Sequence, residues 1–328
     1  MKKLFLVYFL VSIHFFAHSQ VIKGRILDKE TGNPVFSAAV YFNGTSAGTL
    51  SDAEGNFRLD VTKFSSMPLS VSAVGYYSVS LPKFSGSEPN IIYLKPRTFE
   101  LEEVVVSDKS HARERKENLR IFKDVFLGTT VNSYNCRIAN ENDIRFKFSA
   151  DKDTLKAFGL KPLLIDNKAL GYNVTYYLDK FEYNLQDSIF IMNGEVIFRD
   201  DSMASGSKRI SFLQKRRSAY LGSRMHFLRS LWFNELGSAG FEILNSASDT
   251  VRYENLVFQK DIHTKYLKYR GRLKVFYGSS GLESIMIFLK DQILFDPNGF
   301  FEPNGIRWEG TMAQQRIGDM LPYDYSPE

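Results

Sequence analysis

Short runs of β-forming residues, separated by tight polar turns, follow one another from Val21 to Pro96. The run VIKGRIL alternates apolar and polar residues, SAAVYFNG ends at Asn43-Gly44, and FRLDV, LSVSAVGYYSVSL and NIIYLKP follow. An Asn-Gly pair suits the positive φ angles of hairpin turns. Short strands at this spacing, with no helical period between them, are typical of two packed sheets. We therefore expect residues 20–96 to form a seven-stranded β-sandwich.

One turn in this segment has enough acidic residues to raise the question of a metal site. In the turn DAEGN, Asp52 can accept bonds from backbone amides and Gly55 can adopt a left-handed conformation. Calcium binding by Asp52 and Glu54 is the alternative, but Ca²⁺ takes more oxygen ligands than two side chains supply. We interpret the segment as a turn.

The same segment carries turn and core residues in a fixed order, from a Thr-Gly-x-Pro turn to an Asp-x-x-Gly-x-Phe turn. They are Gly24, Asp28, Thr31, Gly32, Pro34, Ala38, Ala39, Val40, Gly44, Thr45, Gly48, Thr49, Asp52, Gly55, Phe57, Gly75 and Tyr76. On these residues the chain resembles the carboxypeptidase regulatory-like domain. The resemblance implies a transthyretin-like sandwich without zinc ligands or peptidase activity. The segment LEEVVVSD, residues 101–108, is similar to one that follows this domain in TonB-dependent outer-membrane transporters.

The N-terminus has the pattern of an export signal. Lys2 and Lys3 precede an apolar stretch, which ends at the small residues Ala17 and Ser19. The stretch is shorter than the ~20 residues that span a bilayer, so we expect a signal peptide, residues 1–19, and no transmembrane segment after its cleavage. No cysteine stands near the cleavage site to accept lipid. The expected location is the periplasm, or the periplasmic or outer face of the outer membrane, of a Gram-negative bacterium.

Charge and cysteine content narrow the classes of protein further. Cys136 is the only cysteine, so no internal disulfide can form and stability must come from burial. The formal net charge is +5, of which Lys2 and Lys3 contribute two. A charge this small argues against a nucleic-acid partner.

The composition changes after Pro96, where charged residues replace the strand pattern. We expect a linker over residues 97–110 and an α+β domain over residues 111–328. Its first helix is predicted over residues 110–128, capped by Ser110 and ended by Gly128. Strands are predicted over 144–150, 155–167, 170–185, 188–200, 251–259, 271–278 and 282–290. A helical segment over 208–236 is predicted to divide at Gly222-Ser223, with Ser223 as the second cap.

Catalytic patterns are missing from the sequence. His111, His226 and His263 have no spacing typical of a zinc site. The segment GSSG, residues 278–281, suits a hairpin turn better than a nucleophile elbow. Cys136 is more simply a structural residue than a nucleophile. There is no P-loop and no dinucleotide-binding motif, so we expect no enzyme, no metal and no cofactor.

Two segments are candidate interaction surfaces. Basic residues seven apart line the segment 208–229 beside its apolar stripe and would suit anionic lipid or acidic glycan, although a solvated helix face is the simpler interpretation. The near-repeat FDPNGF and FEPNGI, residues 295–306, predicts two turns whose aromatic residues could form a carbohydrate-binding rim, with core packing as the simpler interpretation. The candidate residues are Arg209, Arg216, Arg217, Arg224, Phe301 and Trp308.

A second resemblance covers nearly the whole chain. The motifs FLGTTVNS, NKALGYNVTYYL and AYLGSRMHFLRSL are similar to those of uncharacterised exported bacterial proteins that begin with the same sandwich. We therefore expect a non-enzymatic envelope protein with an outer-membrane or periplasmic protein partner, in outer-membrane assembly or nutrient uptake. In it, the sandwich would be a docking or spacer module and the α+β domain would bind a ligand. A carbohydrate-binding accessory protein is the alternative, and an envelope hydrolase is the third.

Overall fold

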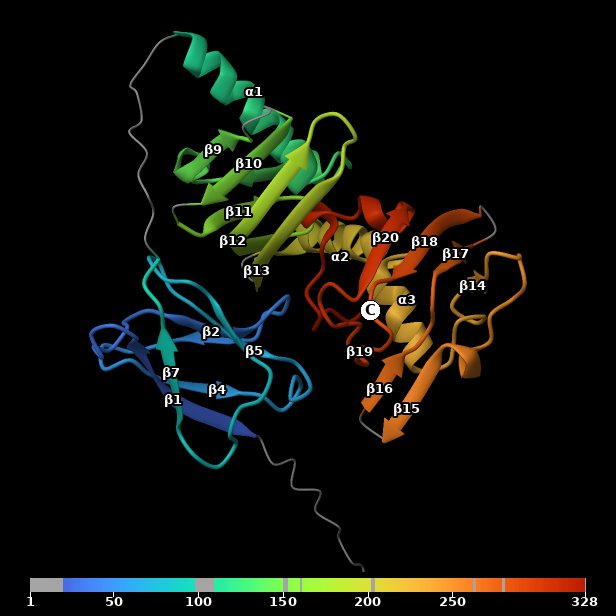
Figure 1. Ribbon diagram of the computed structural model, residues 1–328, viewed down its shortest axis with the longest axis horizontal. Helices are drawn as coiled ribbons and strands as arrows, with labels where there is room; N and C mark the ends of the chain where they lie inside the picture. The colour runs from blue at the N-terminus through green and yellow to red at the C-terminus, as the bar shows by residue number, and fades with distance from the viewer. Residues whose placement is uncertain are drawn as a thin grey trace, which may run out of the picture.

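The computed structural model describes residues 20–97, 109–149, 153–159, 161–201, 204–261, 264–278 and 281–327. The predicted signal peptide, the segment 101–108, the side chain of Ser110, the two serines of the GSSG turn and His263 lie outside the described residues. The described chain is mostly β, and Figure 1 shows it as a blue sandwich, a green sheet beneath a helix and an orange group of strands.

The sandwich predicted from the turn pattern is confirmed. In the described part, β4-β1-β7 form one sheet and β3-β2-β5-β6 form the other. The buried side chains of both sheets make one core, which includes Ile22, Phe42 and Phe57. β1 pairs with β7 in parallel, so the first and the last strand of the domain lie side by side. The strands are β1 (Val21–Asp28), β2 (Ala39–Phe42), β3 (Gly48–Leu50), β4 (Asn56–Asp60), β5 (Leu69–Ser72), β6 (Val79–Leu81) and β7 (Asn90–Leu94).

The segment around Asp52 folds as the expected turn. The Asp52 carboxylate accepts hydrogen bonds from the Asn56 amide at 2.7 Å and from the Glu54 amide at 3.1 Å. Gly55 has a φ of 78°, in the left-handed region that favours glycine. The carboxylate therefore holds the reversal between β3 and β4.

After the sandwich, helix α1 (Lys109–Phe126) covers an antiparallel sheet. The rings of Phe122 and Phe126 from α1 lie 4.8 and 4.9 Å from the rings of Phe181 and Tyr176 on the sheet. These residues belong to a second core. The strands are β8 (Cys136–Ile138), β9 (Ile144–Phe148), β10 (Thr154–Gly159), β11 (Leu163–Asn167), β12 (Tyr172–Asn184) and β13 (Phe190–Asp200).

The prediction of one strand over residues 155–167 is wrong. The chain forms β10 and β11, which both pair with the long strand β12. Pro162 lies between them and has no N–H to donate to a ladder, so an uninterrupted strand is disfavoured there. Along β12 the alternating burial of Tyr172, Val174, Tyr176 and Leu178 agrees with the face predicted from their spacing.

The helical segment divides where glycine and serine predict it. Helix α2 (Gly206–Tyr220) ends before Gly222, whose φ is 74°. Helix α3 (Arg224–Trp232) begins after Ser223, whose hydroxyl accepts a hydrogen bond from the His226 amide at 3.0 Å. The cap therefore fixes the start of α3.

The remaining strands surround α3 and form a third core. In the described residues they make the sheets β14-β17-β18-β20 and β15-β16-β19. Phe227, Leu228 and Leu231 of α3 are fully buried in this core. The strands are β14 (Phe241–Leu244), β15 (Val257–Asp261), β16 (Thr264–Leu267), β17 (Arg272–Tyr277), β18 (Leu282–Phe288), β19 (Ile293–Phe295) and β20 (Ile306–Gly310).

Single-turn 3₁₀ helices connect several of these elements. They are η1 (Ser133–Asn135), η2 (Glu141–Asp143), η3 (Tyr253–Asn255), η4 (Thr311–Gln314) and η5 (Ile317–Asp319). No helix in the described part of the chain is both long and apolar enough to cross a membrane.

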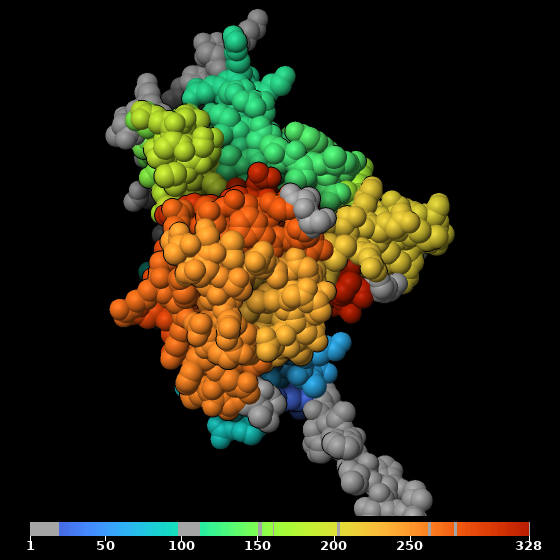
Figure 2. All heavy atoms as spheres, turned by 90° about the vertical axis from the view of Figure 1, so that its right-hand side faces the viewer, coloured from blue at the N-terminus to red at the C-terminus, as the bar shows by residue number. Residues whose placement is uncertain are grey.

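The last residues of the chain return to the middle of the molecule. Ile317, Leu321 and Tyr325 belong to the core beneath α1, whereas Tyr323 also packs against the sandwich. In Figure 2 red C-terminal residues are visible beside the yellow residues of α2. The domain boundaries expected from the sequence stay a prediction, and the region after residue 110 contains two of the three cores.

Candidate binding pocket where the sandwich meets the rest of the chain

The loop between β2 and β3 attaches the sandwich to the edge of β13. The Gly44 amide donates to the Val196 carbonyl at 2.8 Å, and the Phe198 amide donates to the Thr45 carbonyl at 3.0 Å. The Tyr323 amide donates to the Gly44 carbonyl at 2.7 Å, so the C-terminal segment holds the other side of the loop. Gly44 has a φ of 78°, and a Cβ there would lie 2.7 Å from the Tyr323 ring. Glycine is therefore required both by the turn and by this contact.

Polar side chains fill a second part of the junction. The Ser70 hydroxyl donates to the Glu195 carboxylate at 2.8 Å. The rings of Tyr41 and Tyr177 stack with their centroids 6.0 Å apart. Burial, with a smaller contribution from Asp179, raises the pKa of Glu195 to about 7 even though the Ser70 hydrogen bond lowers it. The docked state therefore favours a protonated Glu195.

The first of the two predicted Pro-Asn-Gly turns makes a third contact. The Asp296 carboxylate accepts from the amides of Asn298 and Phe300 at 2.8 and 3.0 Å and from the Ser66 hydroxyl at 3.2 Å. Phe300 packs into the sandwich core, with its ring 5.9 Å from that of Tyr323. This turn is therefore part of the junction.

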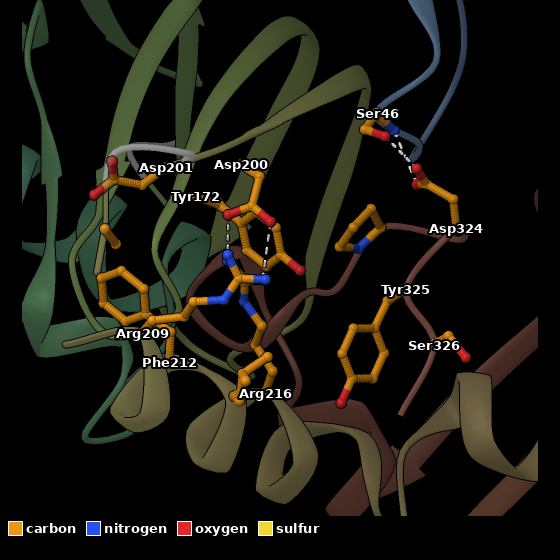
Figure 3. Close-up of a pocket in the computed structure, with 13 residues that line it drawn as sticks. Ser46, Tyr172, Asp200, Asp201, Arg209, Phe212, Arg216, Asp324, Tyr325 and Ser326 are labelled. Atoms are coloured by element: carbon orange, nitrogen blue, oxygen red, sulfur yellow. Dashed lines mark hydrogen bonds and ion pairs between the residues drawn. The ribbon is translucent and has the colours of Figure 1, made fainter. Parts of the chain in front are cut away.

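A pocket of about 430 Å³ opens beside these contacts. Its walls come from α2, the first residue of β12, the end of β13, the C-terminal segment and Ser46 of the sandwich. Figure 3 shows side chains from all of these elements around one hollow. Small-ligand sites have volumes of ~300–1,000 Å³, so this pocket is of suitable size.

Arg216 forms the fixed centre of one wall. Its Nε donates to the Leu170 carbonyl at 2.7 Å, and Nη2 donates to the Gly171 carbonyl at 3.0 Å. Nη1 and Nη2 also bind both carboxylate oxygens of Asp200, at 3.1 and 2.7 Å. The guanidinium carbon lies 3.9 Å from the Tyr172 ring centroid. A planar, bidentate pair of this kind is strongly oriented.

Tyr172 presents its hydroxyl to the hollow. The residue is only 5% exposed, and in Figure 3 its hydroxyl points into the space between α2 and the C-terminal segment. No described residue forms a hydrogen bond with this hydroxyl. Burial raises the pKa of Tyr172 far above its usual value, so the hydroxyl stays protonated and can both donate and accept.

The opposite rim joins the sandwich to the C-terminal segment. The Ser46 amide donates to the Asp324 carboxylate at 3.0 Å, and the Ser46 hydroxyl binds the second oxygen of the same carboxylate. Asp201 is paired with Lys208 at 3.1 Å. Arg209 lines the pocket and makes no ion pair or hydrogen bond with the described residues.

The candidate residues chosen from the basic helices do not share one exposed face. Arg209 and Arg216 both line the pocket. Arg217 is exposed on α2, whereas the Arg224 guanidinium is partly buried and donates to the Gln315 carbonyl at 3.3 Å. The expected broad basic surface is therefore interrupted, because the α2–α3 pair packs inward at Arg216 and Arg224.

The predicted aromatic rim is not at the surface. Trp308 is 9% exposed and packs against Phe227 and Phe301 in the third core, and Phe301 is itself partly buried. The indole N–H of Trp308 has no hydrogen-bond partner among the residues that the structure describes. Burial of this face of β20 removes the ring from contact with a sugar.

Tyr172, Asp200, Asp324 and Ser46 were not among the candidate residues. Each is an ordinary strand, loop or terminal residue in sequence, and they meet only because the β2–β3 loop binds both β13 and the C-terminal segment. The spacing of Tyr172 identified its face but not the pocket above it.

The potentially reactive residues are used elsewhere. Burial lowers the pKa of His226 to about 4, and its Nδ1 accepts the Gly222 amide at 3.1 Å. Burial raises the pKa of Cys136 to about 12. Asp52 and Glu54 lie in the sandwich turn. In the described ranges, no group of three or more His, Cys, Asp or Glu side chains is placed to hold a metal ion.

Comparison with known proteins identifies the family of the N-terminal domain. Residues 22–106 match the family model of the CarboxypepD_reg-like domain, so the sandwich is a domain of this family. Over 96 residues the chain is 40% identical to the TonB-dependent receptor SusC of Bacteroides thetaiotaomicron, a match of 29% of this chain and 9% of that receptor. The chain thus spans a small part of the length of this curated relative.

A solved structure, that of a 9R-lipoxygenase from Cyanothece PCC8801, aligns over 67% of this chain and 48% of the lipoxygenase chain. Its sequence identity is 11% and its TM-score is 0.17, so the alignment carries no argument.

Proposed function

We propose that this chain is a non-enzymatic cell-envelope protein in which the CarboxypepD_reg-like sandwich is a docking module and the following α+β region binds a ligand or protein partner. Its setting would be nutrient uptake or outer-membrane assembly. The family of residues 22–106 and the similarity of 96 residues of the chain to part of a TonB-dependent receptor support an envelope setting. The Lys-rich, then apolar, N-terminus supports export.

The observation that carries the docking role is the loop between β2 and β3. Its main-chain bonds to β13 and to Tyr323 extend the edge of a sheet, which is a common way for one segment to bind another. The bonds from Ser70 to Glu195 and from Ser66 to Asp296 add two further contacts between the sandwich and the rest of the chain. A sandwich bound at three places would act as a fixed part of the ligand-binding body.

Fractionation of native cells with chemical cross-linking tests this function. We expect the mature chain, without residues 1–19, in the envelope fraction and cross-linked to an outer-membrane protein. Recovery of the chain with residues 1–19 intact in the cytoplasm would refute the location. Catalytic turnover of any bound compound by the purified chain would refute the non-enzymatic role.

A further inference from the structure

The pocket beside Asp324 has hydrogen-bonding groups that the protein leaves unused. Tyr172 is only 5% exposed, and its hydroxyl, which opens to the hollow, has no partner among the described residues. Arg216 has five N–H donors and uses four, so one Nη1 hydrogen remains. Buried polar groups are nearly always satisfied, which indicates that water or a ligand completes these bonds.

Acceptors stand beside these donors. Each oxygen of Asp200 accepts one bond from Arg216, and each oxygen of Asp324 accepts one bond from Ser46. A carboxylate can accept about four bonds, so both have room for more. Arg209 adds donors from the side of α2.

The charges of the pocket nearly cancel. Asp200 is paired with Arg216, and Asp201 is paired with Lys208. This leaves Arg209 and Asp324, one of each sign, at the wall. A strongly anionic or cationic ligand would find no excess of opposite charge, so an uncharged polar ligand fits best.

A hydroxyl is the ligand group that matches this arrangement. It can donate to a carboxylate and accept from a guanidinium or phenol through one oxygen atom, whereas a peptide amide needs two separate atoms for the same purpose. The rings of Phe212 and Tyr325 supply apolar surface in the same hollow, against which the C–H face of a ligand ring can pack.

We propose that this pocket binds a neutral polyhydroxylated compound, a saccharide of one or two rings, held by Tyr172, Arg216, Asp200, Arg209 and Asp324. This inference rests on the proposed function, because it specifies the class of ligand that the α+β region would bind. Because Ser46 completes the wall, the docked sandwich takes part in binding.

Isothermal titration of the purified mature chain tests the site. The probes are a panel of neutral mono- and disaccharides, including glucose, galactose, maltose, cellobiose and lactose, with glucuronate and glucosamine as charged counterparts. We expect at least one neutral sugar to bind and both charged counterparts to bind more weakly.

Two variants place that binding in the pocket. Tyr172→Phe removes only the hydroxyl, and we expect about tenfold weaker binding. Arg209→Ala should weaken binding about tenfold or more, because its bonds are charge-assisted. The matched controls are Tyr183→Phe on β12, whose hydroxyl binds Ser188, and Lys215→Ala on the exposed side of α2. Both controls should bind like the unaltered chain.

Three results would overturn the inference. They are no binding of any neutral sugar, tighter binding of glucuronate or glucosamine than of the neutral sugars, and unchanged binding in Tyr172→Phe. All three are measured on purified protein. An envelope location without sugar binding therefore refutes only the ligand, and sugar binding by a chain found in the cytoplasm refutes only the proposed setting.

Discussion

Glu195 should make docking of the sandwich depend on pH. Burial raises its pKa from 4.5, the value of a free carboxyl, to about 7, and exposure on undocking would return it toward 4.5. Below pH 4.5 the side chain is protonated in both the docked and the undocked state. Between pH 4.5 and 7 the docked state keeps its proton while the undocked state loses it, so docking weakens as pH rises. Above pH 7 the full cost remains, about 3 kcal/mol at ~1.4 kcal/mol for each pKa unit.

The variant Glu195→Gln removes the ionisation and keeps an acceptor for the Ser70 hydroxyl. Three kcal/mol corresponds to about a hundredfold change in an equilibrium constant. At pH 8 the amide of Phe198, which donates across the junction to Thr45, should therefore exchange with solvent about a hundredfold more slowly in the variant than in the unaltered chain. At pH 4.5 the two proteins should agree.

Hydrogen exchange, corrected for the intrinsic rate at each pH, measures this difference. The amide of Ile26 is an internal reference, because it donates to Gly55 within the sandwich. Glu242→Gln, on the exposed face of β14, is the matched control. If protection of Phe198 in Glu195→Gln falls with pH as it does in the unaltered chain, burial of this carboxyl does not govern docking.

Three further substitutions, and Gly32→Ala as the control for the first, have defined expectations, each measured by urea unfolding at pH 7. Gly44→Ala should lower the free energy of unfolding by about 2–3 kcal/mol, because φ is 78° and the new Cβ would lie 2.7 Å from an aromatic ring. Gly32→Ala, at φ 72° in open space, should lower it by only about 1 kcal/mol. Arg216→Ala should lower the free energy of unfolding by about 2–3 kcal/mol, since it removes the donor to two backbone carbonyls and the ion-pair partner of Asp200. Trp308→Phe should change the free energy of unfolding by less than about 1 kcal/mol, because removal of an indole N–H that has no partner in the described part of the chain offsets the smaller ring.

Each expectation has a contrary result. Equal losses in the two glycine variants would mean that the aromatic contact at the loop is not tight. A neutral Arg216→Ala would mean that water satisfies the freed carbonyls. A loss of several kcal/mol in Trp308→Phe would mean that the indole N–H is bonded in solution.

The parts of the fold that sequence predicts are those with local causes. The sandwich follows from turn residues such as Gly55, whose conformation few other residues adopt. The division of α2 from α3 follows from Gly222 and the Ser223 cap. The parallel pairing of β1 with β7 joins segments far apart in sequence, and no local signal announces it. Short strands such as β19 are only a few residues long, so they show no measurable period.

The pocket was predicted only in part, because its residues come from segments far apart in sequence. Helical spacing brought Arg209 and Arg216 together as basic residues, but it could not show that Arg216 turns inward to meet Asp200. Likewise, strand alternation cannot say which face of β20 is covered, so Trp308 was placed on a rim although it is buried. Tertiary packing decides both cases.

The wall that Ser46 and Asp324 share sets an order on events during synthesis. A ribosome or a secretion channel releases the early strands long before the final residues, so the sandwich can mature while its future neighbour is still missing. The wall of the pocket is complete only once Asp324 has been synthesised and has bonded to Ser46. Loss of a short C-terminal stretch, by a late stop codon or a protease, would therefore remove one wall of the pocket and leave the sandwich without its bonds to that segment.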